Sequence, residues 1–250
     1  MDSNIHLQRA GLLLGHEGLT ALGACRMIVF GVGGVGSWCV EALARSGVGS
    51  ITVVDSDCVD PTNINRQLVA DFHTVGQVKV NVMARRIHRV NPRCRVHAFA
   101  GVYDERTAPL FDLDSYDVVI DAIDSLAPKA LLINAATRCR HARFVSSMGA
   151  ALKTDIFSIA HAEFWQVRGC PLARALRQRF KRTGVMPARK FQCVYSPQLV
   201  ANRDTGAPDT SQTPNGTKRV NGTIMTTTAA FGLALAQLAL DAALPAGLPK

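Results

Sequence analysis

Glycines, cations and carboxylates stand in this chain in an order that suits chemistry on a phosphorylated ligand. A glycine-rich turn at residues 31–36 is followed by Arg66 and, thirteen residues later, by Lys79. Glycines let a backbone approach a phosphate closely, and cations stabilise charge that develops on phosphoryl oxygens. A hydride-transfer enzyme needs no such pair of cations beside its nucleotide. These residue types therefore favour cleavage of a phosphoanhydride.

The elements around the turn predict how it is positioned. A short apolar run at residues 27–30 predicts a buried strand, and residues 37–45 follow a helical pattern. A second apolar run, at residues 51–54, ends in an acid nineteen residues after the last glycine. Strand, glycine turn, helix, strand and acid form the nucleotide-binding βαβ unit, whose helix N-terminus faces a phosphate. We therefore assign to nucleotide binding Gly31, Gly33, Gly34, Gly36 and Asp55.

Further polar residues separate this site from that of an ordinary dehydrogenase. In chain order they are Asp57, Asn63, Arg66, Gln67, Lys79 and Asp124. Two cations can stabilise a phosphoryl transition state, and carboxylates are ligands that magnesium prefers. By position alone, Lys79 is equally a solvated helix residue, and the glycine turn could serve only close helix–strand packing.

These motifs, taken in order, resemble the ThiF/MoeB/HesA superfamily of ubiquitin-activating-like adenylating enzymes. The motifs are the glycine turn, Asp-x-Asp, Asn-x-Asn-Arg-Gln, Val-Gly-x-x-Lys and Asp-x-x-Asp. Within the superfamily, the chain is most similar to the tRNA threonylcarbamoyladenosine dehydratase branch (TcdA, also called CsdL). The branch motifs lie at residues 33–47, 65–67, 91–96 and 119–130. The resemblance is strong over residues 27–150 and weaker beyond.

The resemblance implies ATP-dependent adenylation of a carboxylate. In the dehydratase branch this is the threonyl carboxylate of threonylcarbamoyladenosine in tRNA, and ring closure then expels AMP. The α-phosphate would lie over the glycine turn, Asp55 would hold the ribose, and Asp57, Asn63 and Gln67 would also contact ATP. The catalytic residues implied are Arg66, Lys79 and Asp124, the last of which would hold magnesium.

Three other functions stay open from the sequence. One is adenylation of the C-terminal glycine of a ubiquitin-like sulfur carrier. Two features argue against it: the paired Cys-x-x-Cys zinc motif is missing, and no cysteine follows Cys193. Another is an NAD-binding oxidoreductase or sensor, which would leave Arg66, Lys79 and Asp124 unexplained. The last is a degenerate tRNA-binding module, which the intact motif set disfavours.

Alternating strand and helix patterns through residue 148 predict a Rossmann-like, doubly wound α/β fold with a mostly parallel sheet and a C-terminal extension of strands and helices. We expect residues 1–150 to form the ATP-binding domain and residues 151–250 a substrate-binding part. The start of the chain lacks a signal-peptide core of adequate length, and the seven cysteines form no Cys-x-x-Cys pair. We therefore expect a cytoplasmic protein.

The second part carries a basic segment, an expected mobile loop and a closing helix. Between Arg168 and Lys190 stand eight cations and no acid, which account for eight of the net +9 charges. Such a cluster is typical of a polyanion-binding surface or of a solvated basic helix, and the resemblance favours tRNA. Residues 196–222 predict the loop, and residues 223–243 a core or dimer-interface helix with too many polar residues for a membrane span.

The resemblance also implies partner proteins. It implies a homodimer, in which a leader arginine reaches the nucleotide across the interface, and a possible sulfur-relay partner. Residues 5–21 predict an amphipathic leader helix, where Arg9 is the one candidate and Leu12 could occupy the family's arginine position. Cys193, at the end of an expected strand over residues 190–195, is a candidate for a chemical role.

Overall fold

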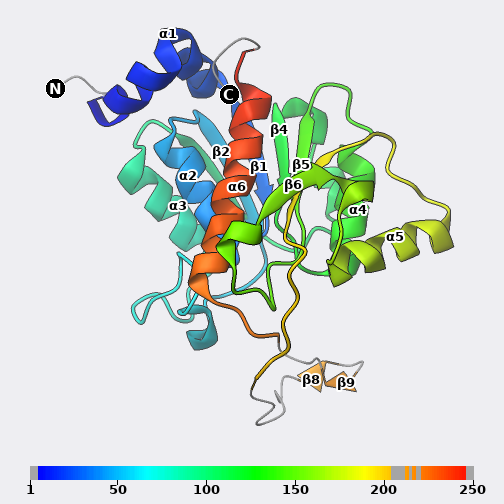
Figure 1. The fold of residues 1–250 in the computed structure, drawn as a ribbon. Helices are drawn as coiled ribbons and strands as arrows, with labels where there is room; N and C mark the ends of the chain where they lie inside the picture. The colour runs from blue at the N-terminus through cyan, green and yellow to red at the C-terminus, as the bar shows by residue number, and fades with distance from the viewer. Residues whose placement is uncertain (1–4, 204–211, 214–215, 218–220, 246–250) are drawn as a thin grey trace.

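A seven-stranded sheet forms the centre of the computed structural model, which describes residues 5–203, 212–213, 216–217 and 221–245 (Figure 1). The strand order is β3-β2-β1-β4-β5-β7-β6, and every neighbouring pair is parallel except β7 and β6. The strands are β1 (Arg26–Phe30), β2 (Ser50–Asp55), β3 (Arg95–Ala100), β4 (Val118–Asp121), β5 (Arg143–Ser147), β6 (Ala160–Glu163) and β7 (Gln192–Tyr195). The predicted mostly parallel α/β fold is confirmed.

Helices cover both faces of the sheet, so its central strands are apolar on both sides. One face carries α2 (Gly36–Arg45), α3 (Lys79–Val90) and α6 (Met225–Ala243), and the other carries α4 (Leu126–Ala136) and α5 (Pro171–Thr183). Along β1, Met27 and Val29 pack into the first core, whereas Ile28 and Phe30 pack into the second. This alternation follows from the two-residue period of a strand.

The chain order reverses at β1, which pairs with β2 on one side and with β4 on the other. In an open parallel sheet, the carboxyl ends of strands at such a switch point form a crevice in which ligands bind. The glycine turn follows β1, Asp55 ends β2, and Asp121 ends β4. The topology therefore gathers the predicted site residues at one edge of the sheet.

The leader and the connections are short helical pieces. Residues 5–24 form η1 (Ile5–Leu7) and α1 (Gln8–Ala24), as predicted, with a break at Gly15, where φ is 69°. Figure 1 shows α1 at the edge where β1 begins, opposite the crevice. The remaining single turns are η2 (Pro61–Asn63), η3 (Ala108–Leu110), η4 (Leu113–Ser115), η5 (Ile156–Ser158) and η6 (Phe164–Gln166).

The C-terminal part joins the same sheet through β7 and β6, and α6 packs against α2. The strand β6 begins only at Ala160, because Asp155 accepts a hydrogen bond from the backbone N–H of Phe157 (2.9 Å) and starts the turn η5 over the preceding residues. The expected loop at 196–222 lies partly outside the described residues, namely at 204–211, 214–215 and 218–220. Within it, β8 (Gln212–Thr213) pairs with β9 (Gly216–Thr217). Among the described helices, none has the length and apolar character that a membrane span requires.

Candidate active site

The glycine turn is built from two different kinds of glycine. Gly31 has a φ of 93°, and a Cβ on it would lie 2.7 Å from the carbonyl oxygen of Ala122. A Cβ on Gly36 would lie 1.8 Å from the carbonyl oxygen of Gly31. Because no side chain fits at such distances, these two glycines are required by backbone packing alone.

The other two glycines border the predicted site residues. A Cβ on Gly34 would lie 3.4 Å from Cγ of Arg66 and 3.3 Å from Cβ of Thr228. A Cβ on Gly33 would lie 3.9 Å from Nε2 of Gln67. The structure therefore brings Arg66 and Gln67, more than thirty residues away in the chain, to the glycine turn.

Asp55 holds the turn from the neighbouring strand. Its Oδ2 accepts a hydrogen bond from the backbone N–H of Val32 (2.7 Å), and its Oδ1 accepts one from the N–H of Asp57 (2.9 Å). Burial raises the pKa of the Asp55 carboxyl, against the two backbone donors and the nearby charge of Lys79, which lower it. Ser37 completes the support, since its Oγ donates to the carbonyl oxygen of Gly33 at 2.6 Å.

Lys79 is a buried cation at the start of α3. Only 4% of the residue is exposed, and its Nζ lies 2.9 Å from Oδ2 of Asp57. Its backbone N–H donates to the carbonyl oxygen of Asp57 at 3.0 Å. The interpretation of Lys79 as a solvated lysine is therefore wrong. Asp57 remains 64% exposed at its side chain, so the ion pair opens to solvent on the carboxylate side.

Arg66 is half-buried and fixed at one end. Its Nη1 donates to the carbonyl oxygen of Thr62 (2.7 Å) and to Oδ1 of Asn65 (3.0 Å). Trp38 Nε1 donates to the backbone carbonyl oxygen of Arg66 (3.0 Å). Burial lowers the pKa of the guanidinium, and the charge of Asp124 opposes this. Since Nε and Nη2 have no acceptor among the described residues, Arg66 keeps donors for a ligand.

Asn63 and Gln67 are both buried, and they stand on either side of Arg66 in the chain. Oδ1 of Asn63 accepts from the backbone N–H of Asp60 (3.2 Å), which closes a capping box around η2. Oε1 of Gln67 is buried without a partner in the described part of the chain. Burying an acceptor without a hydrogen bond costs free energy. The position of this oxygen beside the glycine turn therefore indicates a place where a hydrogen-bond donor of a ligand fits.

Asp124 lies beyond the end of β4, exposed, and accepts a hydrogen bond from Ser125 Oγ (3.2 Å). Among the described residues, no group of three or more histidine, cysteine, aspartate and glutamate side chains could hold a metal ion. Magnesium commonly binds through one or two carboxylates together with nucleotide phosphates. Asp124 therefore suits a metal that arrives with a nucleotide rather than a preformed protein site.

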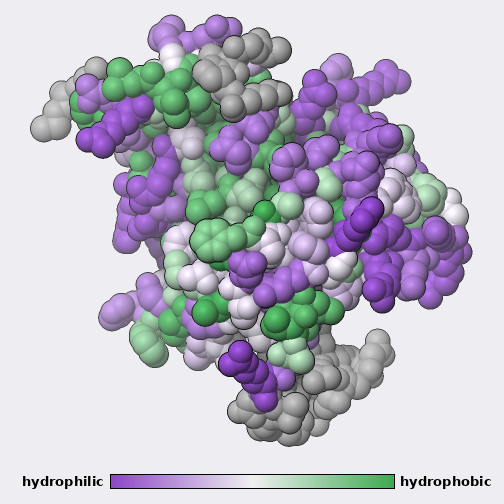
Figure 2. Space-filling model, viewed as in Figure 1, coloured by the Kyte–Doolittle hydropathy of each residue, from purple (hydrophilic) through white to green (hydrophobic). Residues whose placement is uncertain are grey.

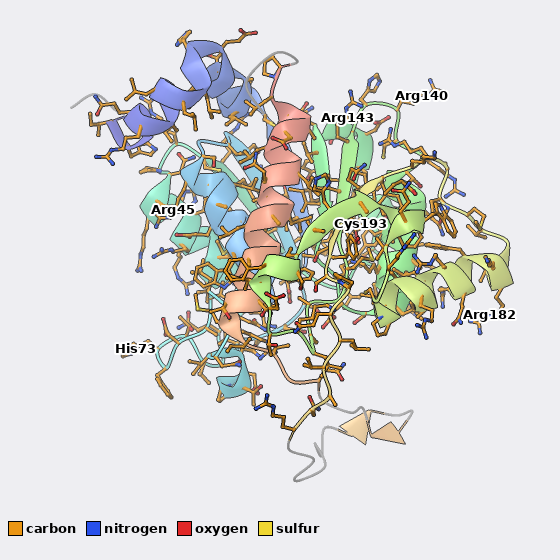
Figure 3. The ribbon with its side chains drawn as sticks, viewed as in Figure 1. Arg45, His73, Arg140, Arg143, Arg182 and Cys193 are labelled. Atoms are coloured by element: carbon orange, nitrogen blue, oxygen red, sulfur yellow. The ribbon has the colours of Figure 1, made fainter. Side chains whose placement is uncertain are left out.

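Two candidates from the sequence lie away from the glycine turn. Arg9 is exposed on α1, at the opposite edge of the sheet. Cys193 is fully buried in β7, and burial raises the pKa of its thiol well above the usual value. Figure 3 shows this side chain inside the molecule, between the strands and α5. A buried, protonated thiol is a poor nucleophile, so Cys193 serves the core.

The basic segment divides into two groups. Arg177 donates to the carbonyl oxygens of Phe164 (3.0 Å) and Val167 (3.1 Å), and Arg189 donates to that of Cys139 (2.9 Å), so both stabilise the fold. The other six face solvent wholly or partly: Arg168, Arg174, Arg179, Lys181, Arg182 and Lys190. Figure 2 shows hydrophilic residues gathered over α5, and Figure 3 shows Arg182 projecting from its end.

Sequence reasoning gave no individual role to several residues that build the site. Asp121 and Lys129 form a buried ion pair (2.7 Å), and Ser37 and Trp38 hold the loop that carries Arg66. One signal was present for the pair. A lysine inside an otherwise apolar helix, eight residues after an acid that ends a buried strand, is unusual unless the two are partners.

Fold and site together define a class, namely doubly wound α/β proteins that hold an arginine and a lysine beside a nucleotide-binding glycine turn. The model of the ThiF family matches residues 6–249, and the chain belongs to this family.

Two curated relatives that cover most of this chain carry the same name. The chain is 44% identical over 188 residues to the tRNA threonylcarbamoyladenosine dehydratase of Bacillus subtilis, covering 75% of this chain and 73% of the relative. It is 37% identical over 242 residues to the Escherichia coli protein of the same name, covering 91% and 89%.

A solved structure of the E. coli enzyme, TcdA, in complex with AMP matches with a TM-score of 0.86 at 33% identity, covering 97% of this chain and 96% of that one. The same enzyme in complex with ATP matches with a TM-score of 0.84.

Proposed function

We propose that this protein is an ATP-dependent tRNA threonylcarbamoyladenosine dehydratase, which adenylates the threonyl carboxylate of the modified nucleoside and then closes a ring. One observation carries the proposal: Arg66 and Lys79 are both held at the crevice where a nucleotide binds in this fold. The relatives of the same name, and their structures with ATP and AMP, support the same reading.

The residues around the turn fit ATP. Gly33 and Gly34 present backbone without side chains, and α2 begins at Gly36, so the positive end of its dipole suits a phosphate over the turn. Asp55 has lone pairs left for the ribose, and the unpaired Oε1 of Gln67 can accept from a ligand hydroxyl. Asn63 and Asp57 are the remaining residues that we assign to ATP binding.

In the first step, an oxygen of the threonyl carboxylate attacks the α-phosphorus and pyrophosphate leaves. Arg66 and Lys79 stabilise the charge that builds on the phosphoryl oxygens. Asp124 would hold magnesium, which would supply further charge neutralisation at the phosphates.

In the second step, a nucleophilic atom of the same threonylcarbamoyl side chain attacks the activated acyl carbon, and AMP leaves. The sum is loss of one water from the modified nucleoside. The step needs positioning rather than a protein nucleophile, which agrees with the burial of Cys193.

The finer features of the proposal concern partners. Residues 151–250 supply the tRNA surface, through the six solvent-facing cations of α5 and its flanks. The protein acts in the cytoplasm, as a homodimer. Leu12 and Leu13 support the dimer, because they are 85% and 75% exposed on α1, beside Arg9, and would be covered by a second copy. A sulfur-relay protein is a further partner that we propose.

The proposal is tested with purified protein and three substrates. Pyrophosphate release is measured with ATP and tRNA that carries threonylcarbamoyladenosine, with unmodified tRNA, and with a small protein ending in Gly-Gly. We expect release only with the modified tRNA, together with a nucleoside 18 mass units lighter in its digest, the mass of one water. Release that depends on the Gly-Gly protein would instead identify a sulfur-carrier adenylating enzyme.

A further inference from the structure

An ion pair lies inside the molecule next to the crevice. Asp121 ends β4 and Lys129 lies in the first turns of α4, and both are 0% exposed. Lys129 Nζ lies 2.7 Å from Asp121 Oδ2, and Ser146 Oγ donates to the same oxygen at 2.7 Å. Replacing a buried ion pair with well-packed apolar residues is often neutral or stabilising, so fold stability alone explains this pair poorly.

The pair holds both backbone polar groups of a single residue, Ile123. The backbone N–H of Ile123 donates to Asp121 Oδ1 (3.0 Å), and Lys129 Nζ donates to the carbonyl oxygen of Ile123 (2.9 Å). Residues 122–124 therefore follow a path that is set by two buried charges rather than by a helix or a strand.

That path borders the candidate active site on two sides. The backbone N–H of Ala122 donates to the carbonyl oxygen of Phe30 (2.8 Å), and the Ala122 carbonyl oxygen lies against Gly31. Asp124 is the residue after Ile123. Its negative charge raises the pKa of the Arg66 guanidinium, against burial, which lowers it. A displacement of the Ile123 backbone would thus move both the support of the glycine turn and the predicted metal ligand.

We propose that Asp121, Lys129 and Ser146 are positioning residues for the adenylation step. They touch no ligand, since all three are buried, and they act through the backbone of Ile123 by placing Asp124 opposite the phosphates. The inference rests on the proposed function in one respect, namely that Asp124 receives magnesium together with ATP.

The test is a double variant, Asp121→Asn with Lys129→Met, which removes both buried charges and nearly preserves volume. A milder variant, Ser146→Ala, removes one hydrogen bond. Ser147→Ala is the matched control, because Ser147 is the next buried residue of β5 and its Oγ donates to Met148 rather than to the pair. Each variant is measured for thermal unfolding, for ATP binding with and without magnesium, and for kcat and KM on modified tRNA.

We expect the double variant to unfold within about 5 °C of the wild type, because a buried pair is removed as a unit. Its kcat should fall at least about tenfold with little change in the KM for tRNA, and magnesium should no longer strengthen ATP binding. Ser146→Ala should change the same quantities in the same direction by about two- to fivefold, and Ser147→Ala should match the wild type.

Two results would overturn the inference. One is a double variant that retains the wild-type kcat and magnesium effect. The other is a loss of activity that follows the loss of folded protein, with the magnesium effect intact in the folded fraction. If the wild type itself fails to act on modified tRNA, the proposed function fails, while the magnesium dependence of ATP binding still decides the role of the pair.

Discussion

Charged side chains serve the two parts of this molecule in opposite ways. At the crevice, Lys79 and Asp121 are buried, and each has a partner within 3 Å. On α5, Arg174, Lys181 and Arg182 face solvent on a helix with no acid. A buried charge acts at one place with little screening, whereas an exposed charge acts through the sum of its neighbours and weakens with salt. The first arrangement suits chemistry on a bond, and the second suits attraction of a polyanion.

A large effect should come from Lys79, the buried cation at the crevice. Lys79→Met keeps the packing of α3 but removes the charge, and it leaves Asp57 free to be hydrated because that side chain is 64% exposed. We expect kcat for pyrophosphate release to fall by about 10²- to 10³-fold, the loss typical of one preorganised electrostatic group, with a smaller change in the KM for ATP.

Arg89→Ala is the control for this variant, because it removes an exposed cation from the same helix. It should retain activity within about twofold. Equal losses in both variants would show that the charge of α3 as a whole matters, and that the buried position of Lys79 does not.

A moderate effect should come from the exposed cations. Changing Arg174, Lys181 and Arg182 together to glutamine should raise the KM for tRNA about tenfold near 0.1 M salt and leave kcat nearly unchanged. The slope of log KM against log salt concentration should fall by about 3, one for each lost phosphate contact. Steady-state kinetics over a salt series measure both quantities.

A matched charge change elsewhere sharpens this prediction. The variant in which Arg85, Arg89 and Arg140 become glutamine also removes three exposed cations, none of them on α5. It should leave the KM for tRNA within about twofold of the wild type. If both triple variants weaken tRNA binding equally, the net charge of the protein rather than the α5 surface attracts the RNA.

The smallest effect concerns stability behind the glycine turn. Burial raises the pKa of Glu41, but hydrogen bonds and charge from Arg86 and Arg45 outweigh it, so the pKa is lowered below its usual 4.5. A lowered folded-state pKa stabilises the fold above the unfolded-state pKa, and this contribution is lost as the pH falls through the folded-state value. Glu41→Gln should therefore destabilise the protein at pH 7 more than at pH 3, as measured by urea unfolding. An equal loss at both pH values would show that the ion pairs contribute nothing.

The contrast between the two parts also explains what could be predicted from the sequence. The strand, turn and helix around residues 27–45 follow local rules of apolar periodicity and glycine conformation, so their bounds agree with the structure to within about one residue. The contact between Arg66 and Gly34 could also be predicted, because the order of the motifs and the family resemblance indicated which distant residues lie together.

Contacts made only in three dimensions could not be predicted. The position of Lys129 in an apolar helix signals a buried partner, but its contact with the carbonyl oxygen of Ile123 follows only from the fold. Likewise, all eight cations of the basic segment look alike in the sequence, yet Arg177 and Arg189 are bound to backbone carbonyls of other elements. The division at residue 150 stays a prediction about roles, since strands from both sides join one sheet.

The central claim is that the crevice cleaves ATP between its α- and β-phosphates with the help of Arg66. The most direct measurement uses ATP labelled at the α- and γ-phosphates, modified tRNA, the wild type, Arg66→Ala and the exposed control Arg140→Ala, which Figure 3 shows at the far edge of the sheet. We predict one AMP and one pyrophosphate per cyclised nucleoside for the wild type and for Arg140→Ala, and neither product above background for a folded Arg66→Ala protein. Formation of ADP, or unchanged pyrophosphate release by Arg66→Ala, would contradict the account.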